Sequence, residues 1–255
     1  YGGSGYPYYG PVCTKKPADI VLMGDSHGRH YAEGLNKLLA EPYGLSLYIA
    51  SGTSCFHLPG FTRKTAGHNW DEICPASLEK ALNFIKANNN TLVIISHSWA
   101  SQMKIADLLD FEGGKKNKSI DLNDIVSGIL SLKKLIGNRT LVVIGEVPRA
   151  EYNLYDIFSR PSVPFIKKID TNIYLTSKAR NYNIILNNHL KVAAIKTGKF
   201  IFLDPHDILC SNNICKNTDD FNRLIYSDAG HLSKYGSEQV VKGFLPELKQ
   251  IMRLK

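Results

Sequence analysis

Continuous runs of apolar residues constrain the fold of this 255-residue chain more than any other feature of its sequence. The runs are rich in Ile, Val and Leu, and they lack the apolar–polar alternation of a half-exposed strand. This pattern is typical of strands that are covered on both faces, as in a parallel sheet. Four runs are strong and the fifth is weaker; in chain order they lie at Asp19–Gly24, Leu45–Ser51 (the weaker one), Thr91–Ser96, Thr140–Pro148 and Lys199–Pro205. We therefore predict one parallel sheet of five strands.

Helical patterns fill the intervals between these runs. The expected helices lie at 28–42, 77–89, 121–138, 169–198 and 233–255. The expected N-caps are Ser77, Asp121 or Asn123, and Ser233, and Gly137 is an expected C-cap. The repeated alternation of strand and helix predicts a doubly wound α/β sandwich with right-handed crossovers.

The opening of the chain differs from the rest. Residues 1–18 are rich in Gly, Pro and Tyr and show no periodicity, which is typical of a linker. We predict that they extend from a preceding domain of a longer protein and that residues 19–255 form a single domain. No apolar run approaches the roughly 20 residues that a membrane-spanning helix needs, so we expect this piece to be soluble.

Lysine and arginine outnumber the acidic residues by 31 to 23, which gives a formal net charge of +8 and a pI near 9.1. A basic surface can favour nucleic acid, anionic lipid or an acidic glycan. The basic residues are scattered, however, apart from a stretch at 113–118, and no nucleic-acid-binding motif is present. We interpret the charge mainly as an aid to solubility and expect no nucleic-acid partner.

The five cysteines allow two local disulfides. Cys210 and Cys215 flank a turn-like segment, and Cys55 and Cys74 bracket a loop rich in Gly, Pro and His, which leaves Cys13 over. Such bridges would contribute about 2 and about 3 kcal/mol through loop entropy and would indicate an oxidising compartment such as the periplasm. The alternative is five reduced thiols in a cytosolic protein. No cysteine spacing matches a zinc site, and we expect neither a metal nor a cofactor.

Polar residues follow four of the predicted strands. In a parallel α/β sheet, ligands bind outside the carboxyl ends of the strands. The residues expected at this edge are Ser26, Gly52, His97, Ser98, Pro148 and Arg149. Ser26 has two interpretations, as the cap of the helix that follows it or as a nucleophile, and the two roles are compatible.

A nucleophilic serine needs a base that takes its proton and a partner that orients the base. Asp228 and His231 lie three residues apart, just before the last predicted helix. This spacing lets the carboxylate reach Nδ1 of the imidazole while Nε2 points elsewhere. The sequence therefore predicts a catalytic triad of Ser26, His231 and Asp228.

Two motifs, GDSH around Ser26 and DAGHLS around His231, resemble those of the SGNH (GDSL-type) hydrolase family. The resemblance implies a flavodoxin-like three-layer α/β/α sandwich, a Ser–His–Asp triad and an oxyanion hole. By motif, Ser26 is the nucleophile, His231 the general base and Asp228 the orienting acid. The backbone N–H groups of Ser26 and Gly52 would bind the oxyanion.

The segment after the third main-sheet strand departs from the family pattern. The family usually has GxND there, and its Asn donates a side-chain hydrogen bond to the oxyanion, whereas this chain has ISHSWA at 95–100. Ser98 falls at the Asn position and His97 is adjacent to it. We expect Ser98 to belong to the oxyanion hole, with His97 as the other residue that could take the place of the Asn.

Five features together resemble one subgroup, the periplasmic SGNH domain fused to acyltransferase-3 membrane domains: GDSH, SGTSC, the Trp-containing block ISHSWA, LCSNNIC and DAGHLS. This resemblance implies an O-acetyltransferase that acylates a bacterial surface polysaccharide such as lipopolysaccharide O-antigen. The acetyl donor would come from a membrane domain of the same chain, the acceptor would be a glycan, and the site would face the periplasm at the inner membrane. We expect the isolated domain to be a monomer.

Two other function classes remain open. A secreted carbohydrate esterase would use the same residues with water as the acceptor. A glycan-binding module would retain the triad without using it.

Several further residues have a structural and a functional interpretation. His97, Trp99 and Arg149 are candidate substrate-binding residues, although core packing is the favoured role for Trp99. His27 and His30 have a spacing that could suit a metal, but no third ligand is apparent, so packing is favoured. Asp25 is expected to bond the backbone around the turn rather than to act in catalysis.

Overall fold

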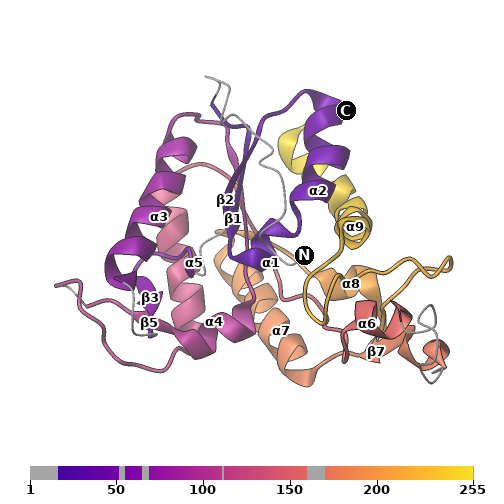
Figure 1. Ribbon diagram of the computed structural model, residues 1–255. Helices are drawn as coiled ribbons and strands as arrows, with labels where there is room; N and C mark the ends of the chain where they lie inside the picture. Colours follow the sequence, from indigo (N-terminus) through magenta and orange to yellow (C-terminus); the bar gives the residue numbers. More distant parts are fainter. Residues whose placement is uncertain (1–16, 52–54, 65–68, 111, 160–169, 255) are drawn as a thin grey trace.

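The computed structural model describes residues 17–51, 55–64, 69–110, 112–159 and 170–254, and its centre is a five-stranded parallel sheet (Figure 1). The strands are β1 (Ile20–Gly24), β2 (Leu47–Ser51), β4 (Leu92–Ser96), β6 (Leu141–Ile144) and β8 (Ile201–Leu203). They pair in the order β2-β1-β4-β6-β8. Every residue of β1, β4 and β6 is buried, as their continuous apolar runs predict. The predicted sheet is confirmed.

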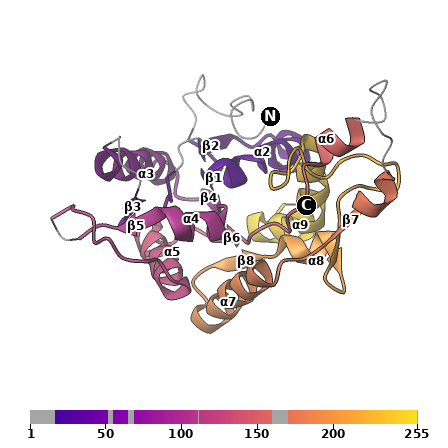
Figure 2. The same cartoon turned by 60° about the horizontal axis from the view of Figure 1, so that its bottom comes forward.

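Helices cover both faces of the sheet (Figures 1 and 2). The first face packs against α3 (Trp70–Lys86), α5 (Leu122–Ile136) and α7 (Asn181–Thr197), and the second against α2 (Ala32–Leu35) and α9 (Lys234–Met252). Alternate strand residues divide between the two cores: Val21 and Met23 lie in the first, Ile20 and Leu22 in the second. The α/β sandwich is therefore confirmed.

Three of the predicted helix ends are confirmed in detail. Helix α5 begins after Asp121, whose side chain accepts hydrogen bonds from the backbone N–H groups of Asn123 and Asp124, and Gly137 ends it. Helix α9 begins after Ser233, whose hydroxyl accepts a hydrogen bond from Gly236 N at 2.9 Å. Both N-caps satisfy N–H groups that a helix start leaves without partners.

Helix α3 begins seven residues earlier than predicted, at Trp70, so the assignment of Ser77 as its N-cap is wrong. Asn69 is the N-cap, and Pro75 lies inside the helix. The Ser77 hydroxyl lies 3.1 Å from Nε2 of His57 instead of capping a helix. The added first turns carry Cys74, which is fixed by a disulfide that the helical pattern alone does not reveal.

The helix predicted over 169–198 is shorter than expected. The described part contains a 3-10 turn (Thr171–Tyr174), strand β7 (Thr176–Lys178) and then α7. Strand β7 pairs antiparallel with β10 (Ile214–Lys216), and this pairing satisfies backbone groups that a helix would otherwise bond internally. Tertiary pairing overrides the local helical pattern here.

The segment after β1 is also less regular than predicted. The single helix expected over 28–42 is divided into α1 (Ser26–Arg29), α2, a π-helical turn (Asn36–Ala40) and a 3-10 turn (Glu41–Tyr43). Pro42 lies within the last of these turns rather than ending a helix before it. Helix α2 packs closely on α9. The two helices are so close that a Cβ on Gly34 would lie 2.5 Å from the carbonyl oxygen of Ser237.

The remaining elements are short. They are β3 (Phe61–Arg63), α4 (Trp99–Ile105), β5 (Ala106–Leu108), α6 (Leu154–Ser159), α8 (Pro205–Leu209) and β9 (Cys210–Ser211). Strand β3 pairs with β5, and β9 pairs with β10. No helix in the described residues is long and apolar enough to cross a lipid bilayer.

Both predicted disulfides are present. Cys55 is bonded to Cys74 and Cys210 to Cys215, with Cα atoms 5.3 and 3.9 Å apart. The first bridge ties the loop after β2 to the start of α3, and the second joins β9 to β10. Cys13 lies outside the described residues.

Candidate active site

The register of the parallel sheet aligns the loops that follow three adjacent strands. Gly24 of β1 pairs with Ser96 of β4, and Ser96 pairs with Ile144 of β6. Ser26 and Ser98 therefore each lie two residues beyond the same row of the sheet. Glu146 lies two residues beyond that row on β6, so side chains from three loops meet at the carboxyl edge.

The turn between β1 and α1 needs a glycine. Gly24 has a φ of +142°, and a Cβ there would lie 1.8 Å from the carbonyl oxygen of Ser96. A side chain at this position would force β1 and β4 apart. Asp25 follows as the N-cap of α1, and Ser26 is the first helical residue. At that position the Ser26 N–H has no acceptor within its own helix.

Ser26, His231 and Asp228 come together at this edge although 205 positions of sequence separate Ser26 from His231. Nε2 of His231 lies 2.7 Å from Oγ of Ser26, and Nδ1 lies 2.7 Å from Oδ2 of Asp228. The other carboxylate oxygen of Asp228 accepts hydrogen bonds from Gly230 N and His231 N, each at 2.7 Å. The geometry matches a relay in which the imidazole takes a proton from the hydroxyl.

The Asp228 carboxyl group is held in its ionised form. Burial by itself raises its pKa, but the hydrogen bonds from the His231 side chain and from the His231 and Gly230 backbone lower it by more. The net pKa lies well below the usual range. An ionised Asp228 stabilises the imidazolium that forms when His231 takes a proton.

Two further histidines pack around His231. The ring of His27 lies 4.6 Å from the ring of His231 between centroids, and His30 accepts a hydrogen bond from Leu232 N through Nδ1 at 3.2 Å. Burial lowers the pKa of His27 to about 3 and lowers the pKa of His30 as well. Both rings are therefore neutral near pH 7 and serve as packing partners of the base. No set of three potential metal ligands gathers among the described residues.

Asp25 ties the nucleophile's turn to the loop after β4. Its carboxylate accepts hydrogen bonds from His27 N at 2.8 Å, from Ser98 N at 3.1 Å and from Gln102 Nε2 at 2.7 Å. Its backbone N–H donates to Nδ1 of His97 at 3.2 Å. Burial raises the pKa of Asp25, but contacts with His97, His27 and Gln102 keep the net pKa well below its usual range. The contacts match the structural role predicted for Asp25.

His97 and Trp99 are fully buried, so the prediction that they contact substrate is not supported by the structure. The Nε1–H of Trp99 donates to the carbonyl oxygen of Ile144 at 2.9 Å, and the ring of His97 packs against Phe56 and Trp99. Residues that follow a strand alternate in direction, so His97 and Trp99 point into the core while Ser98 points to the site. Gly52, the predicted oxyanion donor, lies outside the described residues.

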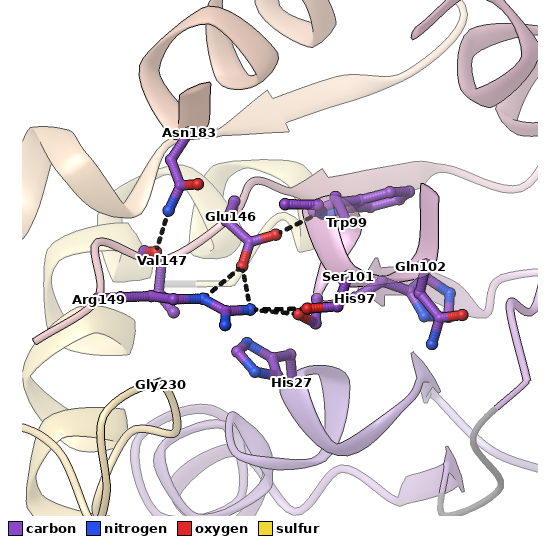
Figure 3. Close-up of polar contacts among 12 residues, drawn as sticks. His27, His97, Trp99, Ser101, Gln102, Glu146, Val147, Arg149, Asn183 and Gly230 are labelled. Carbon is purple, nitrogen blue, oxygen red and sulfur yellow. Dashed lines mark hydrogen bonds and ion pairs between the residues drawn. The ribbon is translucent and has the colours of Figure 1, made fainter. Parts of the chain in front are cut away.

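Arg149 lies beside the triad rather than free in solvent. Figure 3 shows its guanidinium group between Glu146 and Ser101 of α4, next to His27 and Gly230. Its Nη2 donates to Oε1 of Glu146 at 3.0 Å, to Ser101 Oγ at 3.2 Å and to Ser98 Oγ. Its side chain keeps 22% of its surface exposed, which makes it reachable from the site.

Glu146 is a site residue that the sequence analysis missed. It is fully buried, and its carboxylate accepts hydrogen bonds from Arg149 and from Ala100 N. A single Glu next to a buried apolar run was the available signal, because a buried carboxylate requires a partner.

The family comparison decides what kind of domain this is. A family model described as "SGNH domain (fused to AT3 domains)" matches residues 2–246. The chain belongs to this family. A comparison with curated protein sequences gives no match.

Solved structures resemble this SGNH domain at low sequence identity. The periplasmic domain of a lipopolysaccharide acetyltransferase from Salmonella ser. Paratyphi A is 18% identical, with a TM-score of 0.63, over 92% of this chain and 85% of that chain. This likeness supports the shared fold. The likeness to a peptidoglycan O-acetylesterase is weaker: it is 14% identical, with a TM-score of 0.42, over 68% of this chain and 41% of that chain.

Proposed function

We propose that this SGNH domain is an O-acetyltransferase that accepts an acetyl group on Ser26 and transfers it to a hydroxyl group of a bacterial surface polysaccharide such as lipopolysaccharide O-antigen. The observation that carries the proposal is the pair of 2.7 Å contacts that join Ser26 to His231 and His231 to Asp228. Two findings support the transferase chemistry: the family's SGNH domains are fused to AT3 domains, and a lipopolysaccharide acetyltransferase domain shares the fold.

In the first half-reaction, Ser26 Oγ attacks the acetyl carbonyl carbon of the donor and Nε2 of His231 takes the hydroxyl proton. The tetrahedral intermediate then collapses, its bond to the donor's leaving group breaks, and His231 returns the proton to that group. The product is acetyl-Ser26. Asp228 holds the imidazole in the tautomer that presents Nε2 to the serine.

In the second half-reaction, a sugar hydroxyl attacks the acetyl carbonyl carbon and gives its proton to His231. The bond to Ser26 Oγ breaks, and the serine recovers the proton from His231. The acetyl ester now belongs to the sugar. With water as the attacking group the same steps release acetate, so one set of residues serves both outcomes.

The oxyanion of each tetrahedral intermediate needs hydrogen-bond donors. We assign this role to the backbone N–H groups of Ser26 and Gly52 and to Ser98. Donors of this kind act because they are already oriented when negative charge develops, and removing one typically costs about 10²–10³ in kcat.

The donor and the compartment follow from the same assignment. A membrane acyltransferase domain of the same protein would deliver the acetyl group to Ser26 at the periplasmic face of the inner membrane. The two disulfides fit an oxidising compartment.

A turnover assay separates the transferase from an esterase and from a glycan-binding module. The chain is incubated with 4-nitrophenyl acetate as donor, with and without O-antigen polysaccharide as acceptor. A transferase forms acetylated polysaccharide, an esterase forms only acetate, and a binding module forms neither and resists a fluorophosphonate serine reagent. Ser26→Ala should abolish turnover, and Ser131→Ala, an exposed serine of α5, should leave it unchanged.

A further inference from the structure

The Arg149 side chain is held by a buried carboxylate. Nε and Nη2 of Arg149 lie 3.3 and 3.0 Å from Oε1 of Glu146, and the carboxylate has no exposed surface. A buried carboxylate requires partners, and a guanidinium group held by two of its nitrogens has little freedom to turn. Glu146 therefore fixes the direction in which Arg149 points.

Both the carboxylate and the backbone of Glu146 are held by hydrogen bonds. Its Oε2 accepts a hydrogen bond from Ala100 N at 2.9 Å, and its backbone N–H donates to Asn187 Oδ1 at 2.8 Å. Asn187 Nδ2 donates back to the carbonyl oxygen of Glu146 at 3.0 Å. These contacts join the loop after β6 to α4 and α7, so the position of the carboxylate does not depend on a flexible loop.

The anchored guanidinium donates to the hydroxyl group of Ser98. Ser98 is the N-cap residue of α4, yet its hydroxyl makes no capping bond to that helix. Its backbone N–H is already bonded to the Asp25 carboxylate. A serine hydroxyl has one hydrogen to donate and two lone pairs, and because Arg149 occupies a lone pair, the hydrogen is left to donate elsewhere.

The Ser98 hydroxyl lies at the carboxyl edge of the sheet, the edge from which it can reach the reacting carbonyl group. Asp25 accepts bonds from both His27 N and Ser98 N, which ties Ser98 to the turn that carries Ser26. Arg149 also lies beside the triad loop, since a Cβ on Gly230 would be 3.8 Å from its Cζ.

We propose that the Glu146–Arg149 pair is a positioning unit that aims and polarises the Ser98 hydroxyl, so that Ser98 donates to the oxyanion in place of an amide side chain. A hydrogen bond received from a cation makes the serine a stronger donor in turn. Arg149 acts through Ser98 and does not touch the substrate. This inference rests on the proposed function of Ser26 and adds two residues to it.

A double-mutant cycle tests the inference with 4-nitrophenyl acetate as the probe. We expect Ser98→Ala to lower kcat by about 10²-fold and Arg149→Met to lower it by about 10-fold or more, with KM unchanged in both. The double variant should be no slower than Ser98→Ala, because a residue that acts through Ser98 has nothing to act on once the hydroxyl is gone. Arg149→Lys should recover only part of the loss, since an ammonium group cannot hold both the carboxylate and the serines.

Two further variants separate positioning from folding. Arg149→Met leaves the buried carboxylate of Glu146 without its partner. We therefore also measure kcat in the double variant Arg149→Met/Glu146→Gln, in which this unpaired charge is absent. Arg139→Ala is the matched control, because Arg139 precedes β6 at the opposite edge of the sheet and is likewise held by several hydrogen bonds, in its case to backbone carbonyl groups. Its loss should lower the unfolding midpoint and leave kcat unchanged.

Losses that multiply in the double variant would overturn the inference, because Arg149 would then act independently of Ser98. Full activity in Ser98→Ala or in Arg149→Met would also overturn it. Both results are distinct from failure of the proposed function, which would appear as undiminished activity in Ser26→Ala.

Discussion

At the scale of single residues, the site depends on the hydrogen bonds that hold each charged group in position. Asp228 uses one carboxylate oxygen to bind two backbone N–H groups and the other to bind His231. The first set fixes the position of the carboxylate, and the second fixes the imidazole. Position and charge can therefore be tested separately.

Asp228→Asn tests the charge while keeping the shape. The amide oxygen can still accept from Gly230 N and His231 N, but the amide nitrogen then faces Nδ1 of His231 as a donor. The imidazole is forced into the tautomer that cannot take a proton from Ser26, so we expect kcat to fall by about 10²–10⁴-fold with the fold unchanged. Initial rates with 4-nitrophenyl acetate measure this. An Asp228→Asn variant with half or more of the original rate would contradict the assigned role.

The proposed triad could be predicted from sequence because its residues lie in two short motifs, whereas the only signal for Glu146 was a single Glu next to a buried apolar run. One partner, Arg149, lies only three residues away, but the other, the backbone N–H of Ala100, comes from α4, and no local pattern joins it to Glu146. Sequence position places His97 and Trp99 at the correct edge, but only the structure shows that both side chains are fully buried, in agreement with the packing role favoured for Trp99.

At the scale of elements, α9 helps to position His231, because the first turn of the helix is fixed next to the loop that carries this histidine. The Ser233 hydroxyl accepts from Gly236 N at 2.9 Å and donates to the carbonyl oxygen of Leu224 at 2.6 Å. The cap thus ties the helix to the chain that precedes the triad loop. The cap was predictable because its signal is local, whereas the early start of α3 and the strand β7 depend on a disulfide and on strand pairing.

Ser233→Ala removes both bonds of this cap. We expect it to lower the free energy of unfolding by about 1–2 kcal/mol, since a helix N–H loses its acceptor. Denaturant titration monitored by circular dichroism measures the change. The same substitution at the exposed Ser131 of α5 should alter stability by about 0.5 kcal/mol or less. Equal effects at the two serines would show that the cap contributes nothing.

At the scale of the whole molecule, buried histidines link stability to pH. Burial lowers the pKa of His27 and of His57 to about 3, and it also lowers the pKa of His30. In the unfolded chain these groups titrate near 6.5, so between pH 6.5 and pH 3 the unfolded state binds protons that the folded state does not. Stability therefore falls as the pH decreases through this window.

We expect the free energy of unfolding to drop between pH 7 and pH 5, by up to about 2 kcal/mol for each of these histidines. Glu146 works in the opposite direction, because burial raises its pKa and the folded state then holds a proton that the unfolded state has lost. The lowered pKa values of Asp25 and Asp228 matter only below about pH 4. Urea titrations at pH 7, 6 and 5 measure the slope. His57→Gln should flatten it, and an unchanged slope in that variant would argue against a neutral buried His57.

The most direct test of the central claim is to trap the acyl-enzyme. The chain is mixed with an acetyl donor, quenched in acid, digested and analysed by mass spectrometry. The account predicts one acetyl group on the peptide that contains Ser26, lost when a polysaccharide acceptor is added before the quench. Turnover that proceeds with no acetyl group on Ser26, or with the acetyl group on another residue, would contradict it.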